Sequence, residues 1–375
     1  MNFSLDDDQL ALRDAVRRFC DGTYPLHERG NPESATLASQ RWQGLAELGL
    51  LGMPFAADLG GSEQGATEIM LATYELGRSL GGAGFVPAVV LAGQLLAQAG
   101  SPADRERWLP ALAEGKARLS FGLSLAEARG DLSRVGVVAQ AEGDGYVLEG
   151  HKAMVLETDA ADLVVVLART AGADGDTEGL TLFAIDTRLG GVTQTGFSTL
   201  DGRRAAQLRL DEVAVSADAV IGVAHQGHAL ARAAVDRALA AWTSEAVGAI
   251  EALYDLTTDY MKTRKQFGAP LAKFQALQHR MADVLMSLET SRSMACAAAM
   301  AVDEAPDAER RRIIDAAQVV VGKAGRNAGH AAIQLHGGMG MTDECRVGHY
   351  VKRLMVLDQY FGNTTDHLRS LAAAH

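Results

Sequence analysis

Arg264-Lys265-Gln266-Phe267-Gly268, followed by Phe274-Gln275, is a basic and aromatic cluster at the end of a predicted long helix. A guanidinium group matches phosphate oxygens in a fork, and an aromatic face can cover a purine, so this composition favours a nucleotide ligand. The simpler alternative for Arg264 is a helix-end arginine that pairs with a backbone carbonyl. Taken alone, the cluster is weak evidence for a binding site.

A second stretch, Gln334-Leu335-His336-Gly337-Gly338-Met339-Gly340, lies nearer the carboxyl terminus. Paired glycines let the backbone come close to a ligand and expose N–H donors, which is a common device at phosphates. The simpler alternative is a close contact between two helices. His336 lies inside this glycine stretch, and nothing in the sequence marks it as a catalyst.

The hydrophobic pattern changes twice along the chain. Up to residue 118, apolar residues such as Trp42, Leu45 and Leu48 recur at helical spacing. Short apolar runs such as Leu163–Leu167 then indicate strands, and Gln207 to Val213 alternates polar with apolar residues, as a strand with one wet face should. The helical spacing returns after Ile221-Gly222. We therefore predict an α+β multidomain protein with a helical domain over 1–118, a β domain over 119–222 and a helical bundle over 223–375.

Composition and charge exclude several classes of protein. The chain has 375 residues, of which 48% are hydrophobic and 22% charged, and no apolar run reaches the roughly 18 residues that a membrane span requires. A formal net charge of -12 disfavours nucleic acid, and Arg310-Arg311-Arg312 reads as a solvated helix face. The amino terminus, Met1 to Asp8, lacks the pattern of a signal peptide, so we expect a cytoplasmic protein.

The cysteines indicate neither disulfides nor a metal site. Cys20, Cys296 and Cys345 are odd in number, lie far apart and form no Cys-x-x-Cys pair. Reduced structural thiols are the simpler interpretation, and no bound metal is predicted.

In this order, and after helices and strands, the two stretches resemble the acyl-CoA dehydrogenase family. The resemblance extends over nearly the whole chain and includes Leu48-Gly49-Leu50-Leu51-Gly52, Gly150-His151-Lys152 and the run Gln278 to Asp283. It implies a helical amino-terminal domain, a central β domain and a carboxyl-terminal four-helix bundle. It also implies an acyl-CoA substrate, FAD as cofactor, α,β-dehydrogenation of the thioester and a tetramer in which each FAD lies at a dimer interface.

In that family the two stretches grip the adenosine and pyrophosphate arm of the FAD that belongs to the neighbouring subunit. Carried over position by position, the resemblance assigns this role to Arg264, Lys265, Gln266, Phe267, Phe274, Gln275, Gln334, Leu335, His336, Gly337 and Gly338.

The catalytic base of the family is missing from its usual places. The reaction needs a carboxylate to remove the proton alpha to the thioester while hydride leaves the beta carbon for the flavin. Phe361 occupies the usual glutamate position, and Ala238 occupies the place that some relatives use instead. Asp236 and Asp358 are weak candidates, which we interpret as solvated helical charges. We therefore assign no catalytic residue.

The part of the family pattern that faces the flavin ring is altered too. A Thr-Glu-Pro-x-Ala-Gly-Ser-Asp-like loop is replaced by Leu123 to Asp131, and a Trp-Ile-Thr-like strand by Met154-Val155-Leu156. The residues that contact the partner's FAD are retained, while those expected around this chain's own flavin are not. This asymmetry is what a specialised subunit of a mixed tetramer would show.

The chain is most similar to the small subunit of heteromeric enzymes of the pimeloyl-CoA dehydrogenase type, including its Val347-Gly348-His349-Tyr350 stretch. A related large subunit would then supply the base and the flavin cradle, with electron-transferring flavoprotein as a further partner. Two alternatives stay open. One is a self-sufficient dehydrogenase or oxidase with a relocated carboxylate, and the other is a non-catalytic assembly protein.

Overall fold

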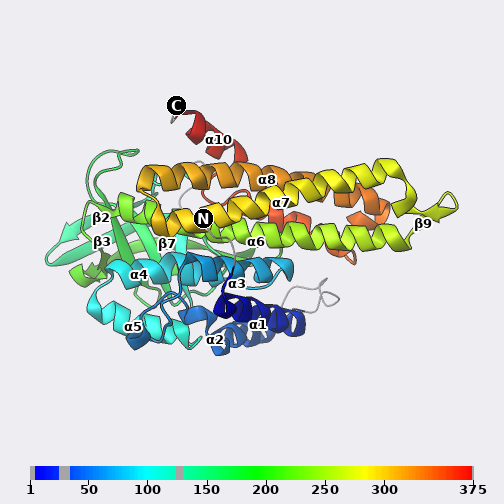
Figure 1. Ribbon diagram of the computed structural model, residues 1–375. Coiled ribbons are helices and arrows are strands. Elements are labelled where there is room, and N and C mark those ends of the chain that lie inside the picture. The colour runs from blue at the N-terminus through cyan, green and yellow to red at the C-terminus, as the bar shows by residue number, and fades with distance from the viewer. Residues whose placement is uncertain (1–4, 25–33, 124–129, 374–375) are drawn as a thin grey trace. The chain divides into compact units, whose positions relative to one another are not determined.

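In the computed structural model of this chain, residues 5–24, 34–123 and 130–373 are described (Figure 1). They divide into two compact units. The helical unit comprises Met1–Ser34, Ala66–Gly82 and Leu239–His375, and the sheet unit comprises Ala35–Gly65 and Ala83–Ala238.

The sheet unit begins with short helices and continues with the strands of one sheet. Its helical elements are α2 (Ala35–Glu47), η1 (Leu50–Gly52), η2 (Ala57–Leu59), η3 (Val86–Gly93), α4 (Gln94–Ala99), α5 (Pro102–Ala113) and η5 (Ala217–Ala219). Its strands are β1 (Leu119–Leu123), β2 (Val137–Glu142), β3 (Gly145–Val155), β4 (Leu163–Arg169), β5 (Leu180–Asp186), β6 (Val192–Ser198), β7 (Arg204–Ser216) and β8 (Val220–Ile221). The predicted change from helices to strands is confirmed.

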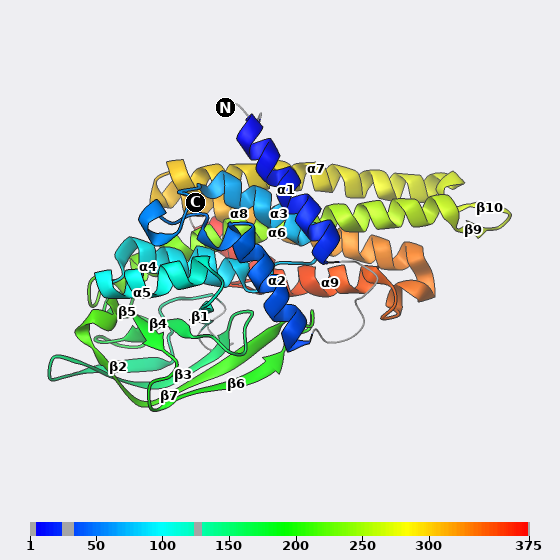
Figure 2. The same cartoon turned by 90° about the horizontal axis from the view of Figure 1, so that it is seen from below.

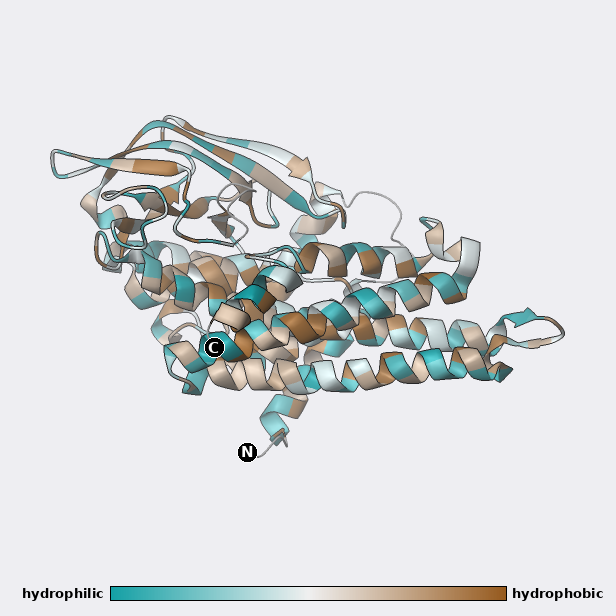
Figure 3. Cartoon of the chain, turned by 90° about the horizontal axis from the view of Figure 1, so that it is seen from above, coloured by the Kyte–Doolittle hydropathy of each residue, from teal (hydrophilic) through white to brown (hydrophobic). Residues whose placement is uncertain are grey.

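The strands form one sheet in the order β6-β7-β3-β1-β4-β5-β8, with β2 paired to β3 and β4 (Figure 2). Along β7 the buried Leu208 and Leu210 alternate with the exposed Gln207 and Arg209. Hydrophilic and hydrophobic residues also alternate along strands of the sheet in Figure 3. Successive side chains of a strand point to opposite faces, so this alternation gives β7 one core face and one solvent face. The predicted strand with one wet face is therefore confirmed.

A lysine lies inside this sheet unit. The Lys152 side chain on β3 is fully buried, and its Nζ donates hydrogen bonds to the carbonyl oxygens of Val135 and Leu167, both at 2.6 Å. Burial disfavours the ammonium form and lowers the pKa of Lys152 to about 7. The amine is thus held by backbone carbonyls in a part of the core where charge is unfavourable.

This burial makes stability depend on pH. Between about pH 7 and pH 10 the unfolded chain binds more protons at Lys152 than the folded chain, so the free energy of unfolding should rise with pH. The rise should approach about 1.4 kcal/mol per pH unit and be absent in Lys152→Met, as measured by urea denaturation across this range. The exposed Lys116 provides the control, because Lys116→Met should keep the slope of the native protein. Equal slopes in the native protein and Lys152→Met would contradict the prediction.

The helical unit consists of long helices joined by short connections. Its elements are α1 (Asp7–Thr23), α3 (Ala66–Arg78), the part of α6 (Gly227–Thr263) from Leu239 onward, β9 (Lys265–Gln266), β10 (Ala269–Pro270), η6 (Leu271–Lys273), α7 (Gln275–Glu304), α8 (Asp307–His336), η7 (Gly337–Met341), α9 (Arg346–Leu357) and α10 (Thr364–Ala373). Helices α6, α7 and α8 run side by side, and the β9–β10 hairpin joins α6 to α7 at one end (Figure 1).

Helices α3 and α6 cross with their backbones almost in contact. A Cβ atom added to Gly77 of α3 would lie 2.0 Å from the carbonyl oxygen of Glu245, and one added to Gly248 of α6 would lie 2.0 Å from that of Tyr74. Ser244 also donates a hydrogen bond to the Met70 carbonyl at 2.7 Å. Small residues at this crossing are therefore required by the approach of the two helices.

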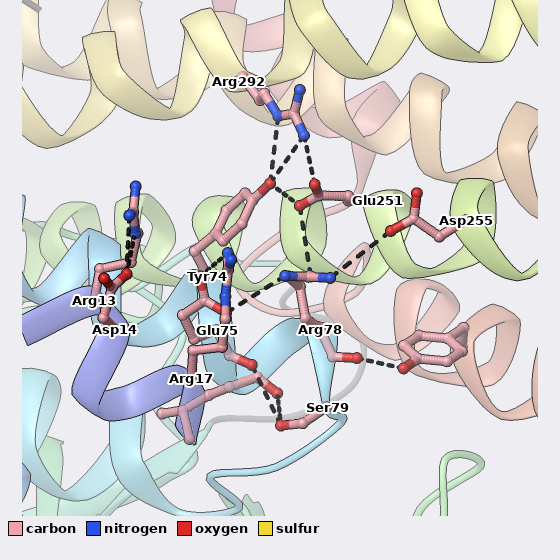
Figure 4. A network of polar contacts seen from close by, with 12 residues as sticks. Arg13, Asp14, Arg17, Tyr74, Glu75, Arg78, Ser79, Glu251, Asp255 and Arg292 are labelled. Carbon is pink, nitrogen blue, oxygen red and sulfur yellow. Dashed lines mark hydrogen bonds and ion pairs between the residues drawn. The ribbon is translucent and has the colours of Figure 1, made fainter. Parts of the chain in front are cut away.

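Charged side chains tie α1, α6 and α7 to α3 (Figure 4). Arg17 of α1 bonds to the buried Glu75 at 2.8 Å. Tyr74 donates a hydrogen bond to Glu251 of α6, which also pairs with Arg292 of α7 at 2.7 Å. These contacts join four helices through groups that are at most half exposed.

Candidate functional site

The first predicted stretch follows the end of α6 and forms the tip of the helical unit. The Arg264 backbone N–H donates to the Tyr260 carbonyl at 2.8 Å, and the Arg264 carbonyl accepts from the Leu271 N–H at 2.9 Å. The Arg264 side chain is exposed and has no hydrogen bond or ion pair to any described residue. Its guanidinium group does not pair with a carbonyl, so the simpler interpretation of a helix-end arginine does not describe it.

Aromatic rings and further cations surround the hairpin. Phe267 is 93% exposed and has a φ of 52°, and its ring meets Phe274 edge to face with centroids 6.2 Å apart. Gln266 and Gln275 are also exposed. Within the described part of the chain, Lys265, Lys273 and Arg280 have no carboxylate partner. An exposed aromatic ring beside unpaired cations offers both a flat apolar face and positive charge to a ligand. This combination suits a flat anionic ligand.

The second stretch lies where α8 ends. Gly337 has φ 62° and ψ -142°, a conformation that only glycine adopts readily. A Cβ atom added to Gly337 or Gly338 would meet nothing within 4 Å, so neither glycine is required by a helix contact in this chain. Gln334 is exposed, whereas Leu335 and His336 are buried. The glycine backbone therefore faces open space.

The fold brings the two stretches to the same end of the helical unit. Leu335 of α8 packs with Met261 of α6 and Met281 of α7 in one buried cluster. The rings of Tyr260 and His336 are stacked with centroids 4.2 Å apart. Unpaired cations and two glycines with open space beside them thus lie at the same end of the unit, where a pyrophosphate could approach them. The Gly337 N–H itself already donates to the Gln334 and Ile333 carbonyls.

The position of the expected base is filled by aromatic packing. Phe361 is 3% exposed with a left-handed φ of 55°, and it stacks on Trp242 of α6 with centroids 6.0 Å apart. Tyr360 packs on the same indole at 4.7 Å. Ala238, the second expected position, is fully buried. No proton acceptor stands at either place.

The interpretation of Asp236 and Asp358 as solvated charges was wrong. Asp236 is only 1% exposed. Asp358 accepts hydrogen bonds from the Thr364 N–H at 3.1 Å and from its hydroxyl, and pairs with Arg326 at 3.2 Å. Helical periodicity does not show which face of α6 becomes buried, and a turn ahead of α10 cannot be seen in sequence. Asp358 holds the start of α10.

Sequence reasoning missed a third carboxylate, Glu245. It is 3% exposed and pairs with Arg353 of α9 through two contacts, at 2.8 and 3.0 Å. Glu245 follows Ala238 by seven residues, so both lie on similar faces of α6. This spacing was the only feature of the sequence that could have pointed to Glu245. The bidentate arginine occupies both carboxylate oxygens, so Glu245 is poorly placed to accept a proton from a substrate.

The segment expected near the flavin ring carries a buried ion pair. Ser124 to Arg129 of the altered loop lie outside the described residues. Leu156 is buried, and Glu157 next to it pairs with Arg203 at 2.7 Å and accepts the Gly84 N–H at 2.8 Å. The Glu157 carboxylate is therefore bound by groups of this chain.

Three features bear on nucleic-acid binding, metal binding and membrane insertion. Arg310 and Arg311 are not the solvated charges expected, because they lie partly buried beside Asp307 and Asp315 at 2.7 and 2.9 Å. Across the described ranges no group of three or more His, Cys, Asp or Glu side chains could hold a metal ion. No described helix is both long enough and apolar enough to cross a bilayer.

Comparison with known proteins agrees with this arrangement. Residues 6–116, 120–213 and 225–375 match, in turn, the amino-terminal, middle and carboxyl-terminal domains of acyl-CoA dehydrogenase. The chain belongs to the acyl-CoA dehydrogenase family. It is 29% identical to the probable acyl-CoA dehydrogenase YngJ of Bacillus subtilis, over 100% of this chain and 99% of that protein.

Solved structures are similar over the whole chain. Butyryl-CoA dehydrogenase from Megasphaera elsdenii has a TM-score of 0.90 and 25% identity, covering 100% of this chain and 99% of that one. A chain of the ChsE4–ChsE5 complex from Mycobacterium tuberculosis has a TM-score of 0.85 and 24% identity, covering 100% and 98%. The predicted acyl-CoA dehydrogenase fold is therefore confirmed.

Acyl-CoA dehydrogenases are FAD-dependent oxidoreductases of fatty acid metabolism and are typically tetramers. The tip of the helical unit fits the charged arm of FAD, because unpaired guanidinium and ammonium groups and open glycine backbone lie together there. At the position where the sequence led us to expect the base, Phe361 stacks on Trp242.

Proposed function

We propose that this chain is the small subunit of a mixed acyl-CoA dehydrogenase. It would hold the adenosine and pyrophosphate arm of an FAD whose ring lies in a related large subunit, which supplies the catalytic base. The observation that carries the proposal is the burial of Phe361 against Trp242 at the position expected for the base. A phenyl ring cannot accept the alpha proton of a thioester.

The surrounding carboxylates support the same conclusion. Dehydrogenation requires a base that reaches the alpha carbon while the flavin accepts a hydride from the beta carbon. Asp358 is engaged by Thr364 and Arg326, and Glu245 by Arg353. Asp358 and Glu245 therefore have roles in holding helices together.

The tip supports the cofactor-binding half of the proposal. Arg264 and Lys265 are exposed and have no acidic partner in the described ranges, so a pyrophosphate would gain charge-assisted hydrogen bonds without breaking existing ones. Gly337 and Gly338 leave room for the phosphates to approach the backbone. These four residues would then contact the FAD of the neighbouring subunit, and the tip would be essential to the assembly.

The choice of a mixed assembly has support in a structural neighbour. The ChsE4–ChsE5 complex combines two different chains, one of which has this fold over its length. Resemblance to the small subunit of pimeloyl-CoA dehydrogenase-type enzymes led to the same choice. We propose an acyl-CoA thioester as the substrate of the complex and electron-transferring flavoprotein as its electron acceptor.

Flavin content tests the proposal. The chain is purified alone and after co-expression with a candidate large subunit, and the visible flavin spectrum is recorded before and after anaerobic addition of acyl-CoA. A colourless lone chain and a yellow complex with one FAD per pair of chains, bleached by substrate, are expected. A yellow lone chain that substrate bleaches would overturn the proposal and direct attention to Asp236 as a relocated base.

Removing the guanidinium of Arg264 should loosen the cofactor. Charged hydrogen bonds contribute roughly 1.5 to 3 kcal/mol, so Arg264→Ala should raise the dissociation constant of FAD in the complex by about tenfold to a hundredfold. The release of flavin fluorescence on dilution measures this change. Arg312→Ala is the matched control. It removes the same positive charge from an exposed arginine, but Arg312 lies near the start of α8, at the opposite end of the helix from Gly337. Equal retention in both variants would count against the assignment.

A further inference from the structure

Tyr260 and His336 form a stacked pair beneath the proposed pyrophosphate site. Their ring centroids are 4.2 Å apart and their planes differ by 21°. Tyr260 lies in the last turn of α6 and is half-buried, and His336 is the last residue of α8 and is 8% exposed. The pair therefore joins the ends of two helices that are far apart in the sequence.

Each ring is directly connected to one of the two stretches. The Tyr260 carbonyl accepts the Arg264 N–H at 2.8 Å and so fixes where the chain leaves α6. His336 immediately precedes Gly337, whose left-handed conformation turns the backbone away from α8. A change in the distance between the rings would change the distance between Arg264 and the glycine backbone.

Hydrogen bonding and charge indicate that His336 does not bind phosphate itself. Its Nδ1 lies 2.9 Å from the Ala332 carbonyl oxygen, which can only accept, so Nδ1 carries the proton. Burial lowers the pKa of His336, so the ring is neutral at neutral pH. A neutral buried ring with Nδ1 already engaged holds its neighbours in place and offers no positive charge to an anion.

We propose that the Tyr260–His336 stack is a positioning pair that sets Arg264 and the Gly337–Gly338 backbone at the separation needed to hold one pyrophosphate. This inference rests on the proposed function, because it concerns the same FAD arm. The buried cluster of Met261, Met281 and Leu335 holds the helices together, and the stack fixes their ends. Tyr260 and His336 act through the residues that follow them.

Ring substitutions in the complete complex test the pair. Tyr260→Ala and His336→Ala each remove the stack, and should speed FAD release by about threefold to tenfold, the range expected for loss of an aromatic pair. Tyr260→Phe and His336→Phe keep two stacked rings and should restore retention. No hydrogen bond of the Tyr260 hydroxyl to a described residue exists, so Tyr260→Phe removes nothing else.

A double-mutant cycle separates positioning from general weakening of the fold. If Tyr260 acts through Arg264, then Tyr260→Ala should add little to FAD release once Arg264 is alanine, and the two changes should not be additive. Leu288→Ala is the stability control, because Leu288 is buried in α7 and should lower the unfolding temperature without speeding FAD release. Flavin fluorescence and thermal unfolding are measured on the same samples.

The outcomes distinguish this inference from the proposed function. Faster FAD release in Arg264→Ala together with no change in Tyr260→Ala would overturn the positioning pair and leave the proposed function standing. No change in Arg264→Ala would remove the FAD-arm assignment itself. Additive effects in the double variant, or equal release from Leu288→Ala and Tyr260→Ala, would show that the stack contributes only stability. Non-additive effects with rescue by both phenylalanine variants are the result we expect.

Discussion

Glu245→Ala should lower the free energy of unfolding by about 3 to 5 kcal/mol. Glu245 and Arg353 are both almost fully buried and meet through two contacts, at 2.8 and 3.0 Å. Removing the carboxylate leaves a guanidinium group in the core without its main counter-charge. Arginine side chains keep their charge even when buried, so the unpaired guanidinium destabilises the fold.

Urea denaturation at one fixed protein concentration measures this loss, because assembly also contributes to apparent stability. The double variant Glu245→Met with Arg353→Met is the control, since replacing both partners of a buried ion pair by apolar side chains is often close to neutral. A loss below about 1 kcal/mol in Glu245→Ala would show that the pair is solvated in solution. Recovery in the double variant would identify the uncompensated charge as the cause.

Gly248→Ala should also destabilise the protein, by about 3 kcal/mol. The added methyl group would lie 2.0 Å from the Tyr74 carbonyl oxygen and 3.0 Å from the Arg78 backbone nitrogen. Both are backbone atoms of α3, so no side chain can move aside and the two helices must separate. Their separation would also stretch the Tyr74–Glu251 and Arg78–Glu251 contacts between the two helices, which Figure 4 shows.

Gly22→Ala is the matched control for this substitution. Gly22 lies in α1, and a Cβ atom there would meet nothing within 4 Å. Alanine favours the helix over glycine by roughly 0.5 to 1 kcal/mol, so this variant should be slightly more stable than the native protein. Thermal unfolding of both variants compares the same chemical change with and without a backbone clash. Similar unfolding temperatures for the two variants would contradict the crossing of α3 and α6.

Local patterns predicted the architecture well. Alternation in Gln207 to Val213 and the spacing of Trp42, Leu45 and Leu48 depend on neighbours within one element, so a single sequence reveals them. The two stretches near Arg264 and Gly337 could also be found in the sequence, because clustered cations and paired glycines are short local patterns. The domain limits at 118 and 222 remain a prediction.

Contacts between distant segments could not be predicted. Trp242 and Phe361 stack across more than a hundred residues of sequence, and neither residue has a local pattern that marks the other. The same holds for Glu245 with Arg353 and for Tyr260 with His336. Asp236 was misread because its burial depends on which face of α6 is covered. Pairing of this kind is decided by packing.

In the proposed small-subunit role, the rings around position 361 would make a return to independent catalysis difficult. A single Phe361→Glu exchange would place a carboxylate against Trp242 and Tyr360, in a site where burial disfavours its charge. It would also place the glutamate on a left-handed backbone at position 361. Several large side chains would have to shrink together before any one change was useful. Such a chain can continue to diverge as a partner more easily than it can return to being an independent enzyme.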